Sequence, residues 1–371
     1  MAGFEFTQYV TYEDSGSIIA LRGLNCKNGR LDLSDVKYID NSNLSKLTRS
    51  KLYIGDILFT YVGTVGEVAI IEENDRYYLA PNVSRIRLNN GYNPYFVKQL
   101  LHTNRFYNKI ILPLIATSSQ PALSMENVRK FALQIPSISE QHKISSFLTL
   151  LDKRIATQIK IIEKLESLIR GIVETHYSQC ECINQVRISE LGEPFSTMNM
   201  SKEDLSEEGN ECILYGELFT TYGCVIKEVK SRTHISTNKS TVSQSNDLLF
   251  PASTTVDAMS LIAPSAICKE GVILGGDLFG VHVNKKYNNE YLSYLINYIY
   301  KSKLARYAQG STIIHLHYSD IKNATLLLPT IEEQNYLAHI MRGVEEKINM
   351  EKDMLSKLYS QKAYLLSNLF I

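Results

Sequence analysis

Two stretches of sequence decide how this chain is organised: Ile135-Pro-Ser-Ile-Ser-Glu-Gln141 and Leu328-Pro-Thr-Ile-Glu-Glu-Gln334, which lie 193 residues apart. Further segments match at nearly the same offset. They are Thr117–Ser124 with Gly310–His317, Gly55–Phe59 with Asn246–Phe250, and Ile19–Leu24 with Ile213–Leu218. Repetition at a fixed spacing is typical of duplicated structural units. The chain is therefore predicted to contain one unit twice, each copy a mixed domain followed by a helix.

A long helix is predicted after each proline of the repeated motif. In the first copy, mostly apolar residues follow in alternating steps of four and three: Ile144, Leu148, Leu151, Ile155, Gln158, Ile162, Leu165, Ile169 and Ile172. The positions 193 residues later are Leu337, Met341, Val344, Ile348, Glu351, Leu355, Leu358, Lys362 and Leu365. A period of 3.5 predicts two helices, 139–177 and 332–371, that pack as a coiled coil. Ser139 is the expected cap of the first helix.

One polar position is shared by both seams, at Gln158 and Glu351. Gln158 lies at the centre of its seam, so antiparallel pairing over the full length would place it opposite Glu351. We predict a polar pair that fixes this register at some cost in stability. The alternative is that both residues occupy an exposed position. Helices of roughly 30 residues would form a rod about 45 Å long.

The segments before the helices combine β-type and helical patterns. Runs rich in Ile, Val and Tyr at 51–59, 67–72 and 83–88 predict strands, and a helical stretch at 95–111 is mirrored at 291–307. The prediction is an α+β fold: mixed α/β domains at 1–138 and 178–331, joined by an antiparallel coiled coil with pseudo-two-fold symmetry. The second copy has about 35 residues between Ser178 and Cys212, whereas the first has 18 for the same span. We therefore expect the first domain to be shortened at its N-terminal side.

Composition excludes several classes of protein. A chain of 371 residues fits two ordinary domains, and 39 basic residues balance 39 acidic ones, so no overall charge marks a nucleic-acid or membrane partner. The sequence has no apolar run of 18 residues and no signal peptide at its start, so no membrane association is expected. The six cysteines are scattered. A reduced, cytoplasmic protein is the expectation.

Two similar domains on an antiparallel helix pair would suit a ligand that presents two sites at a fixed distance. Duplex DNA is such a ligand, because half-sites on one face recur about every 34–36 Å. The predicted partner is therefore double-stranded DNA.

Three motifs together resemble the specificity subunit of type I restriction-modification systems. They are Gly55-Asp-Ile-Leu-Phe-Thr-Tyr-Val-Gly-Thr-Val-Gly-Glu-Val-Ala-Ile70, Thr117-Ser-Ser-Gln-Pro-Ala-Leu-Ser124, and Ile135-Pro-x-x-x-Glu-Gln141, the last followed by Lys143-Ile and Leu151-Asp152. The resemblance implies two target recognition domains, each reading half of a bipartite, asymmetric site. It also implies helices that set the gap and bind two methyltransferase subunits, with restriction and translocase subunits joining through the complex. Pro251-Ala-Ser-Thr-Thr-Val-Asp257 replaces the Gly-Thr-Val-Gly pattern in the second copy, as divergent specificity would produce.

Motifs for catalysis are missing from the sequence. There is no Gly-x-x-x-x-Gly-Lys-[Ser/Thr] loop for a nucleotide, and Asn93-Pro94-Tyr95 is one proline short of the strip that stacks a flipped base, so it is expected to open a helix. Asp35-Val-Lys37 has nuclease-like spacing without a second acid. His315-x-His317 lacks a third metal ligand other than Asp320. We expect a non-catalytic subunit without a cofactor or metal of its own.

The candidate DNA-binding residues are polar groups at loop positions and basic groups on the helix before each coil. In the first copy they are Thr60, Tyr61, Thr64, Arg105, Lys109, Ser118, Ser119 and Gln120; in the second they are Lys301, Lys303, Arg306, Ser311, Thr312, His315 and His317. Such groups can contact base edges and phosphates, although solvated helix faces would look the same.

Neither domain is strongly basic. Residues 1–138 hold 15 basic and 12 acidic side chains, and residues 178–331 hold 13 and 16. Weak DNA binding by the chain alone is therefore expected. Exposed helix residues such as Arg154, Lys160 and Lys164 would form the docking surface for partners. The alternative function is a protein-binding scaffold, or a degenerate specificity subunit, that does not read sequence.

Overall fold

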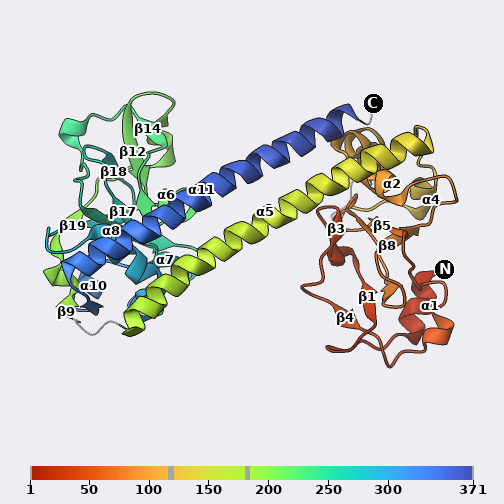
Figure 1. Cartoon of the computed structure of the whole chain (residues 1–371), viewed down its shortest axis with the longest axis horizontal. Helices are drawn as coiled ribbons and strands as arrows, with labels where there is room; N and C mark the ends of the chain where they lie inside the picture. The colour runs from red at the N-terminus through yellow and green to blue at the C-terminus, as the bar shows by residue number, and fades with distance from the viewer. Residues whose placement is uncertain (1, 116–120, 180–183, 370–371) are drawn as a thin grey trace. The chain divides into compact units, whose positions relative to one another are not determined.

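The structure is a computed structural model that describes residues 2–115, 121–179 and 184–369. It divides into two compact units, Met1–Ile159 with Asp353–Ile371, and Lys160–Lys352. Two long helices, α5 (Ile138–Gln179) and α11 (Ile331–Asn368), each run without interruption (Figure 1). Each unit therefore combines a globular α/β part with a section of both helices.

The first unit holds the elements that precede α5. Its helices are α1 (Ala2–Tyr9), α2 (Pro94–Leu101), α3 (Asn104–Phe106) and α4 (Met125–Arg129), with a π-helical turn at Tyr107–Ile111. Its strands are β1 (Ile19–Leu21), β2 (Cys26–Lys27), β3 (Arg30–Leu31), β4 (Lys37–Tyr38), β5 (Ile57–Thr60), β6 (Val68–Ile70), β7 (Tyr77–Leu79) and β8 (Val83–Ile86).

The second unit holds the elements between the long helices. Its strands are β9 (Asn184–Arg187), β10 (Gly192–Ser196), β11 (Leu205–Ser206), β12 (Asn210–Leu214), β13 (Val225–Ile226), β14 (Ser231–Thr233), β15 (Asp247–Pro251), β16 (Ser253–Thr254), β17 (Ser265–Ile267), β18 (Ile273–Gly275), β19 (Leu278–Val283), β20 (Ile314–His315) and β21 (Thr325–Leu328). Its helices are α6 (Glu217–Thr220), α7 (Ala258–Leu261), α8 (Asn289–Leu295), α9 (Lys301–Ala305) and α10 (Tyr318–Ile321), with a π-helical turn at Ile296–Tyr300.

The predicted repeat is present in the sheets of both units. In the first, β1 lies between antiparallel β4 and parallel β7; in the second, β12 lies between antiparallel β14 and parallel β18. Likewise β5 lies between antiparallel β6 and β8, and β15 between antiparallel β17 and β19. Both faces of β5 are covered, because Ile57 and Phe59 pack with helix α2 while Leu58 packs with β1. The fold is thus α+β with an internal duplication.

A buried aspartate lies at the start of the central strand of each unit: Asp56 directly precedes β5, and Asp247 is the first residue of β15. Asp56 accepts a hydrogen bond from Tyr53 N at 2.9 Å, and Asp247 accepts one from Gln244 N at 2.8 Å. Each aspartate also pairs across the sheet, Asp56 with Arg87 and Asp247 with His282, both at 2.6 Å. The turn closed by Asp56 explains why the strand predicted at 51–59 begins only at Ile57.

The second unit has strands that the first lacks among its described residues. Its β15 sheet has five strands, with β10 at the edge beside β19 and β13 at the edge beside β17, whereas the β5 sheet has three. In addition, β9 pairs with β21. Both β9 and β10 come from the segment between Ser178 and Cys212. The shortening of the first domain stays a prediction.

The long helices begin one residue earlier than predicted, at Ile138 and Ile331, and the capping residue differs from the prediction. Ser137, not Ser139, caps α5, because Ser139 already lies inside the helix. Ser137 N and its hydroxyl both donate to Glu140. Thr330 and Glu333 repeat this arrangement at the start of α11.

The predicted seam is the buried side of both helices. Leu148, Leu151, Ile155, Gln158, Ile162 and Ile169 are buried on α5, as are Leu337, Met341 and Ile348 on α11. Within the first unit the two helices are antiparallel, since Leu148 shares a core cluster with Leu365 while Asp152 pairs with Lys362 at 2.7 Å. Glu351 forms an ion pair with Lys347. The pairing of Gln158 with Glu351 stays a prediction.

The helix predicted at 95–111 is interrupted, because Thr103 caps a new helix: its hydroxyl accepts from Phe106 N at 3.1 Å. In the second unit α8, the π-helical turn and α9 follow each other directly from Asn289 to Ala305.

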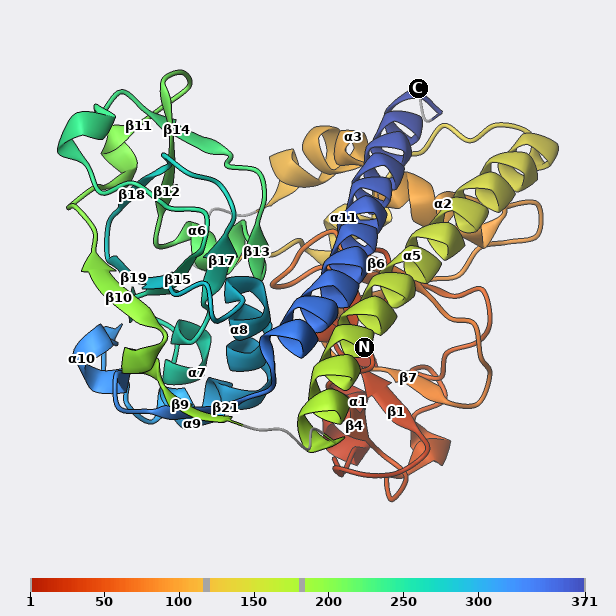
Figure 2. The ribbon, with the colours of Figure 1, turned by 60° about the vertical axis from the view of Figure 1, so that its left-hand side comes forward.

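Two hydrogen bonds repeated in both units fix the helix before the coil to the long helix. Gln141 accepts from Asn93 N at 2.8 Å, and Gln334 accepts from Asn288 N at 3.0 Å. Eleven residues further along each long helix, about three turns, Asp152 accepts from Gln99, and Glu345 accepts from the Tyr294 hydroxyl. In the second unit α8 lies between strand β17 and the long helix α11 (Figure 2). The glutamine of the Pro-x-x-x-Glu-Gln motif is therefore a structural residue.

Burial of Glu345 makes the stability of the second unit depend on pH. Burial raises the pKa of the Glu345 carboxyl above its ordinary value, although the Tyr294 hydrogen bond lowers it. A raised pKa in the folded state gives stability that is present below the unfolded pKa and is lost as pH rises through the folded pKa. We expect Glu345→Gln to remove this loss, so that the unfolding temperature measured by calorimetry becomes flatter between pH 4 and pH 8. The exposed neighbour Glu346, whose pKa the Lys227 hydrogen bond lowers, is the control: Glu346→Gln should not flatten the curve in this direction.

Candidate nucleic-acid interface

The structure brings together, in each unit, the two segments in which the sequence analysis placed the polar candidates. In the second unit β16 pairs with β20, with Ser253 opposite His315. In the first unit Val62 bridges Ala122, the positions that the repeat makes equivalent. Beside this bridge, Gly63 N donates a hydrogen bond of 3.0 Å to Pro121 O. One framework thus presents different side chains in the two copies.

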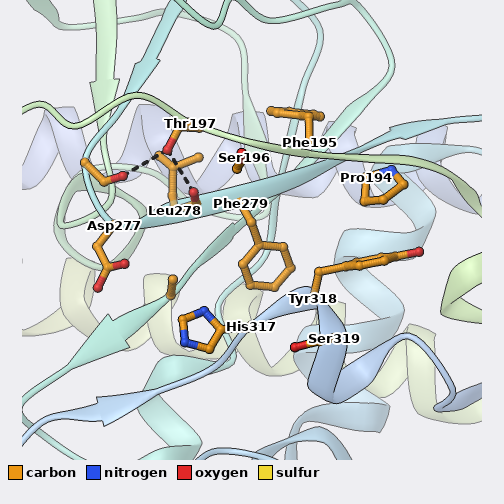
Figure 3. A pocket seen from close by; sticks show the side chains of 12 residues that line it. Pro194, Phe195, Ser196, Thr197, Asp277, Leu278, Phe279, His317, Tyr318 and Ser319 are labelled. Carbon is orange, nitrogen blue, oxygen red and sulfur yellow. Dashed lines mark hydrogen bonds between the residues drawn. The ribbon is translucent and has the colours of Figure 1, made fainter.

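A pocket of about 450 Å³ adjoins β20 in the second unit. Its lining includes Pro194, Phe195, Ser196, Asp277, Phe279, His317, Tyr318 and Ser319 (Figure 3). Figure 3 shows the His317 ring between the Asp277 carboxylate and Ser319. The wall is held by Thr197, whose hydroxyl donates to the carbonyls of Gly276 and Leu278 at 2.9 and 2.8 Å.

His315 lies next to the polar side chains of the pocket but is not part of its lining. Its Nδ1 lies 4.0 Å from the Asp277 carboxylate, and its ring is stacked against that of His317 with centroids 6.2 Å apart. A carboxylate can accept from the cytosine amino group, and an imidazole can donate to or accept from other base edges. The loop before β20 is closed by two hydrogen bonds between Gln309 and His315, at 2.9 and 2.7 Å, which leaves Ser311 and Thr312 exposed at its tip. These groups can contact base edges without any covalent chemistry.

The candidates of the first unit occupy less uniform positions. Thr60 is fully buried, and its hydroxyl bonds to Thr64 O, so it holds the turn and does not present its hydroxyl to solvent. Tyr61 is half-buried against the core, and Thr64 is exposed at the loop tip. Ser118, Ser119 and Gln120 lie outside the described residues. Among the described candidates Thr60, Tyr61 and Thr64, Thr64 is the most exposed.

The basic candidates do not form one face in the second unit. Lys301 and Lys303 are two residues apart on α9, and such positions point to different sides of a helix. Lys303 and Arg306 are both exposed, and Lys303 Nζ lies 3.4 Å from Thr325 O and 5.3 Å from the centre of the Tyr300 ring. In the first unit Arg105 and Lys109 do line one common groove.

Sequence reasoning missed Asp277 and Ser319 in the pocket. Asp277 follows two glycines, and Gly276 has a φ of +80°, a conformation that glycine adopts readily. A polar residue after a glycine turn is a signal that could have identified this position.

Residues weighed for catalysis are occupied by structural contacts. Asp35 accepts from Arg22 at 3.0 Å, and Asn93 caps α2 by accepting from Phe96 N at 3.1 Å, as expected for a residue that opens a helix. Among residues 2–115, 121–179 and 184–369, no three His, Cys, Asp or Glu side chains gather as a metal site would require. No helix in the same ranges has the apolar length that a membrane span needs.

Comparison with known proteins gives a consistent result. Residues 23–167 and 183–359 each match the model of the "Type I restriction modification DNA specificity domain". The chain is 24% identical over 360 residues, 89% of its length and 81% of the relative's, to the "Putative type I restriction enzyme MjaX specificity subunit" of Methanocaldococcus jannaschii. It is 28% identical over 130 residues, 33% of its length and 26% of the relative's, to the type I restriction enzyme EcoBI specificity subunit of Escherichia coli.

A solved structure shares the fold. The S subunit of a type I restriction-modification system from M. genitalium aligns with a TM-score of 0.62 at 14% identity, covering 98% of this chain and 91% of that one. The two family matches span most of the sequence and coincide with the two structural copies. The chain therefore belongs to the family of type I restriction-modification DNA specificity proteins, with two copies of the family's domain.

Proposed function

We propose that this chain selects the DNA sequence on which a type I restriction-modification complex acts, each globular domain reading one half of a bipartite, asymmetric site. The observation that carries the proposal is that the two units share a strand contact but have different side chains at it. The same strand contact that holds Val62 beside Ala122 in the first unit holds Ser253 beside His315 in the second. A common fold with different polar groups at its tips is what two half-sites of different sequence require.

The balanced charge of the chain favours a complex in which other subunits make most of the contacts to DNA phosphates. Because 39 basic residues balance 39 acidic ones, non-specific attraction to phosphates is weak. Base contacts worth about 1–3 kcal/mol each would supply discrimination. Two methyltransferase subunits would supply most of the phosphate contacts and the cofactor, and restriction and translocase subunits would join through them. The chain itself then acts as a non-catalytic subunit.

The base contacts of the second domain can be tested with paired substitutions in its pocket. We expect His317→Ala combined with Asp277→Ala to relax one or two positions of one half-site, because each lost contact removes about 1–3 kcal/mol of discrimination. The other half and the gap should stay unchanged. The measurement is the methylated motif in cells that also express the modification subunit. His339→Ala, at an exposed histidine of α11, is the control, and a motif that is the same in both variants would contradict this assignment.

Apolar side chains exposed on the helices support the docking of partner subunits. In the first unit Phe147 and Leu150 on α5 are 47% and 65% exposed, and Tyr364 on α11 is 68% exposed. Arg154 is exposed one helical turn after Leu150. Exposed apolar groups outside a packed seam are typical of protein interfaces.

Leu150→Asp is expected to weaken binding of the methyltransferase subunit at least about tenfold, since a charge would be desolvated in the interface. The side chain is exposed, so the fold should be retained. Leu24→Asp, at a leucine 48% exposed in the globular part, is the matched control. Equal dissociation constants for the two variants in a titration would show that α5 does not dock the partner here.

A further inference from the structure

The pocket beside β20 in the second unit has an apolar floor and a polar rim. Leu278 and Phe279 of β19 form the floor and are only 4% and 6% exposed. Asp277, His317 and Ser319 line the same pocket and are exposed. Its volume of about 450 Å³ lies within the range of small-molecule sites. This arrangement suits a ligand with an apolar body and polar groups at its edge.

The pocket is continuous with the strands whose loops are proposed to contact DNA. Leu316 N donates a hydrogen bond of 2.9 Å to the carbonyl of Ala252, which lines the pocket. The neighbouring residues in sequence, Ser253 and His315, lie opposite each other in β16 and β20. A duplex held against these two strands would therefore lie beside the pocket.

Two aromatic rings belong to the lining. The Phe279 ring is stacked on Phe250 inside the sheet, with centroids 5.0 Å apart, and Tyr318 is half-buried at the start of α10. In the view of Figure 3 the Phe279 ring lies between the Tyr318 ring and the pair of His317 and Asp277. Aromatic side chains at a nucleic-acid surface stack on bases that have left the duplex stack.

The first unit has other residue types at the positions of both rings. Ser84 takes the place of Phe279, since it lies opposite Phe59 in the same register of the central sheet. Met125 takes the place of Tyr318 at the repeat offset of 193. The first unit forms the same central sheet without these rings, so the fold does not require them. They are a property of the second domain alone.

A base that stays paired cannot reach the floor of this pocket, because stacked bases present only their edges in the grooves. A base that rotates out of the stack can enter a pocket, where aromatic or apolar side chains contact its ring and polar groups read its edge. The ionised carboxylate of Asp277 can only accept hydrogen bonds, so it favours an amino group on the base. The imidazole of His317 can donate to or accept from the ring nitrogen beside that amino group.

We propose that this pocket binds one base that rotates out of the DNA duplex and carries an exocyclic amino group, as cytosine and adenine do. Tyr318 stacks on the base, Phe279 forms the floor beneath it, and Asp277 accepts from its amino group. The inference rests on the proposed reading of DNA by this domain and adds that one position of its half-site is read outside the duplex. Thymine has no amino group and is bound poorly.

The test offers an unpaired base to the full chain. One strand of a short duplex carries a single extra deoxycytidine, deoxyadenosine or thymidine, and the parent duplex carries none. Dissociation constants are measured by fluorescence anisotropy at low ionic strength, where attraction to phosphates is strongest. An extra deoxycytidine or deoxyadenosine is expected to tighten binding at least about fivefold, because no base pair has to be broken and one base gains an aromatic contact. The duplex with the extra thymidine should bind like the parent.

Substitutions then identify the pocket as the cause of the gain. Tyr318→Ala and Asp277→Ala should each remove it, and Asp277→Ala should keep the fold because Asp277 is exposed. Tyr318→Phe retains the ring and should retain the gain. The control is Tyr336→Ala, at a tyrosine of α11 that is 67% exposed, and it should also retain the gain.

Two results would overturn the proposal. One is the same dissociation constant for the parent duplex and for the duplexes with an extra deoxycytidine or deoxyadenosine. The other is a gain that the extra thymidine gives equally or that Tyr318→Ala retains in full, since an interrupted duplex is also more flexible. The first result together with a methylated motif of two defined halves would leave the proposed function in place and remove this inference alone. A gain without any methylated motif would support the pocket and count against the proposed function.

Discussion

Replacing Arg342 with alanine is expected to lower the unfolding temperature of the second unit by about 6–12 °C. Arg342 on α11 donates three hydrogen bonds of 2.7–2.9 Å to Glu290 on α8, whose side chain is only 6% exposed. Removing one partner of a buried pair leaves an uncompensated charge, worth roughly 3 kcal/mol when the lost partner is partly exposed, as Arg342 is. For a unit of this size each kcal/mol shifts the midpoint by about 2–4 °C.

The comparison with related variants isolates the buried charge as the cause. Glu290→Gln combined with Arg342→Ala should recover much of the loss, because no charge is then left in the interior. The first unit supplies an internal control, since the repeat places Tyr95 and Thr149 at the two positions and its calorimetric transition should not move. A midpoint for Arg342→Ala within 1–2 °C of the parent chain would show that the pair is solvated and contributes little.

Lengthening both long helices is expected to widen the gap between the two halves of the DNA site by about nine base pairs. Three heptads that continue the apolar seam would be inserted between Ile159 and Lys160 and between Lys352 and Asp353, where the two compact units meet in sequence. Twenty-one residues add about 31 Å of helix, and duplex DNA rises about 3.4 Å per base pair. The added length is close to one turn, so both domains could still approach the same face of the duplex.

The readout is the motif methylated in cells that co-express the modification subunit. Both half-sites should keep their sequences while the gap increases. The same insertion in α5 alone is the control, and it should abolish methylation because the two helices could no longer pair in register. A lengthened protein that methylates the parent motif with the parent gap would show that the helices do not set the spacing.

The architecture could be predicted from the sequence because the duplication repeats each pattern, so that a pattern seen in one copy can be checked in the other. The seam from Ile144 to Ile172 identified the buried side of α5 and, shifted by 193, that of α11. The period of the apolar residues and the offset between the copies can both be read from the sequence, and they were enough to predict the two long helices and their buried sides.

The site was less predictable, because a side chain's exposure depends on contacts that are distant in sequence. Thr60 is a residue type that can contact bases, but its hydroxyl donates a hydrogen bond to Thr64 O in its own turn. The Lys303 side chain lies beside Thr325 O. Asp277 becomes part of the pocket only because β19, β10 and α10 meet there. Glu290 and Arg342 are 52 residues apart and have no counterpart pair in the first copy, so the repeat could not indicate them.

The most direct test of the account is to map methylated adenines across a genome in which this chain is co-expressed with its modification subunit. The account predicts a motif of two defined halves separated by a fixed number of unspecified base pairs. A stable complex that methylates nothing, or a motif with only one defined half, would contradict the claim that both domains read sequence.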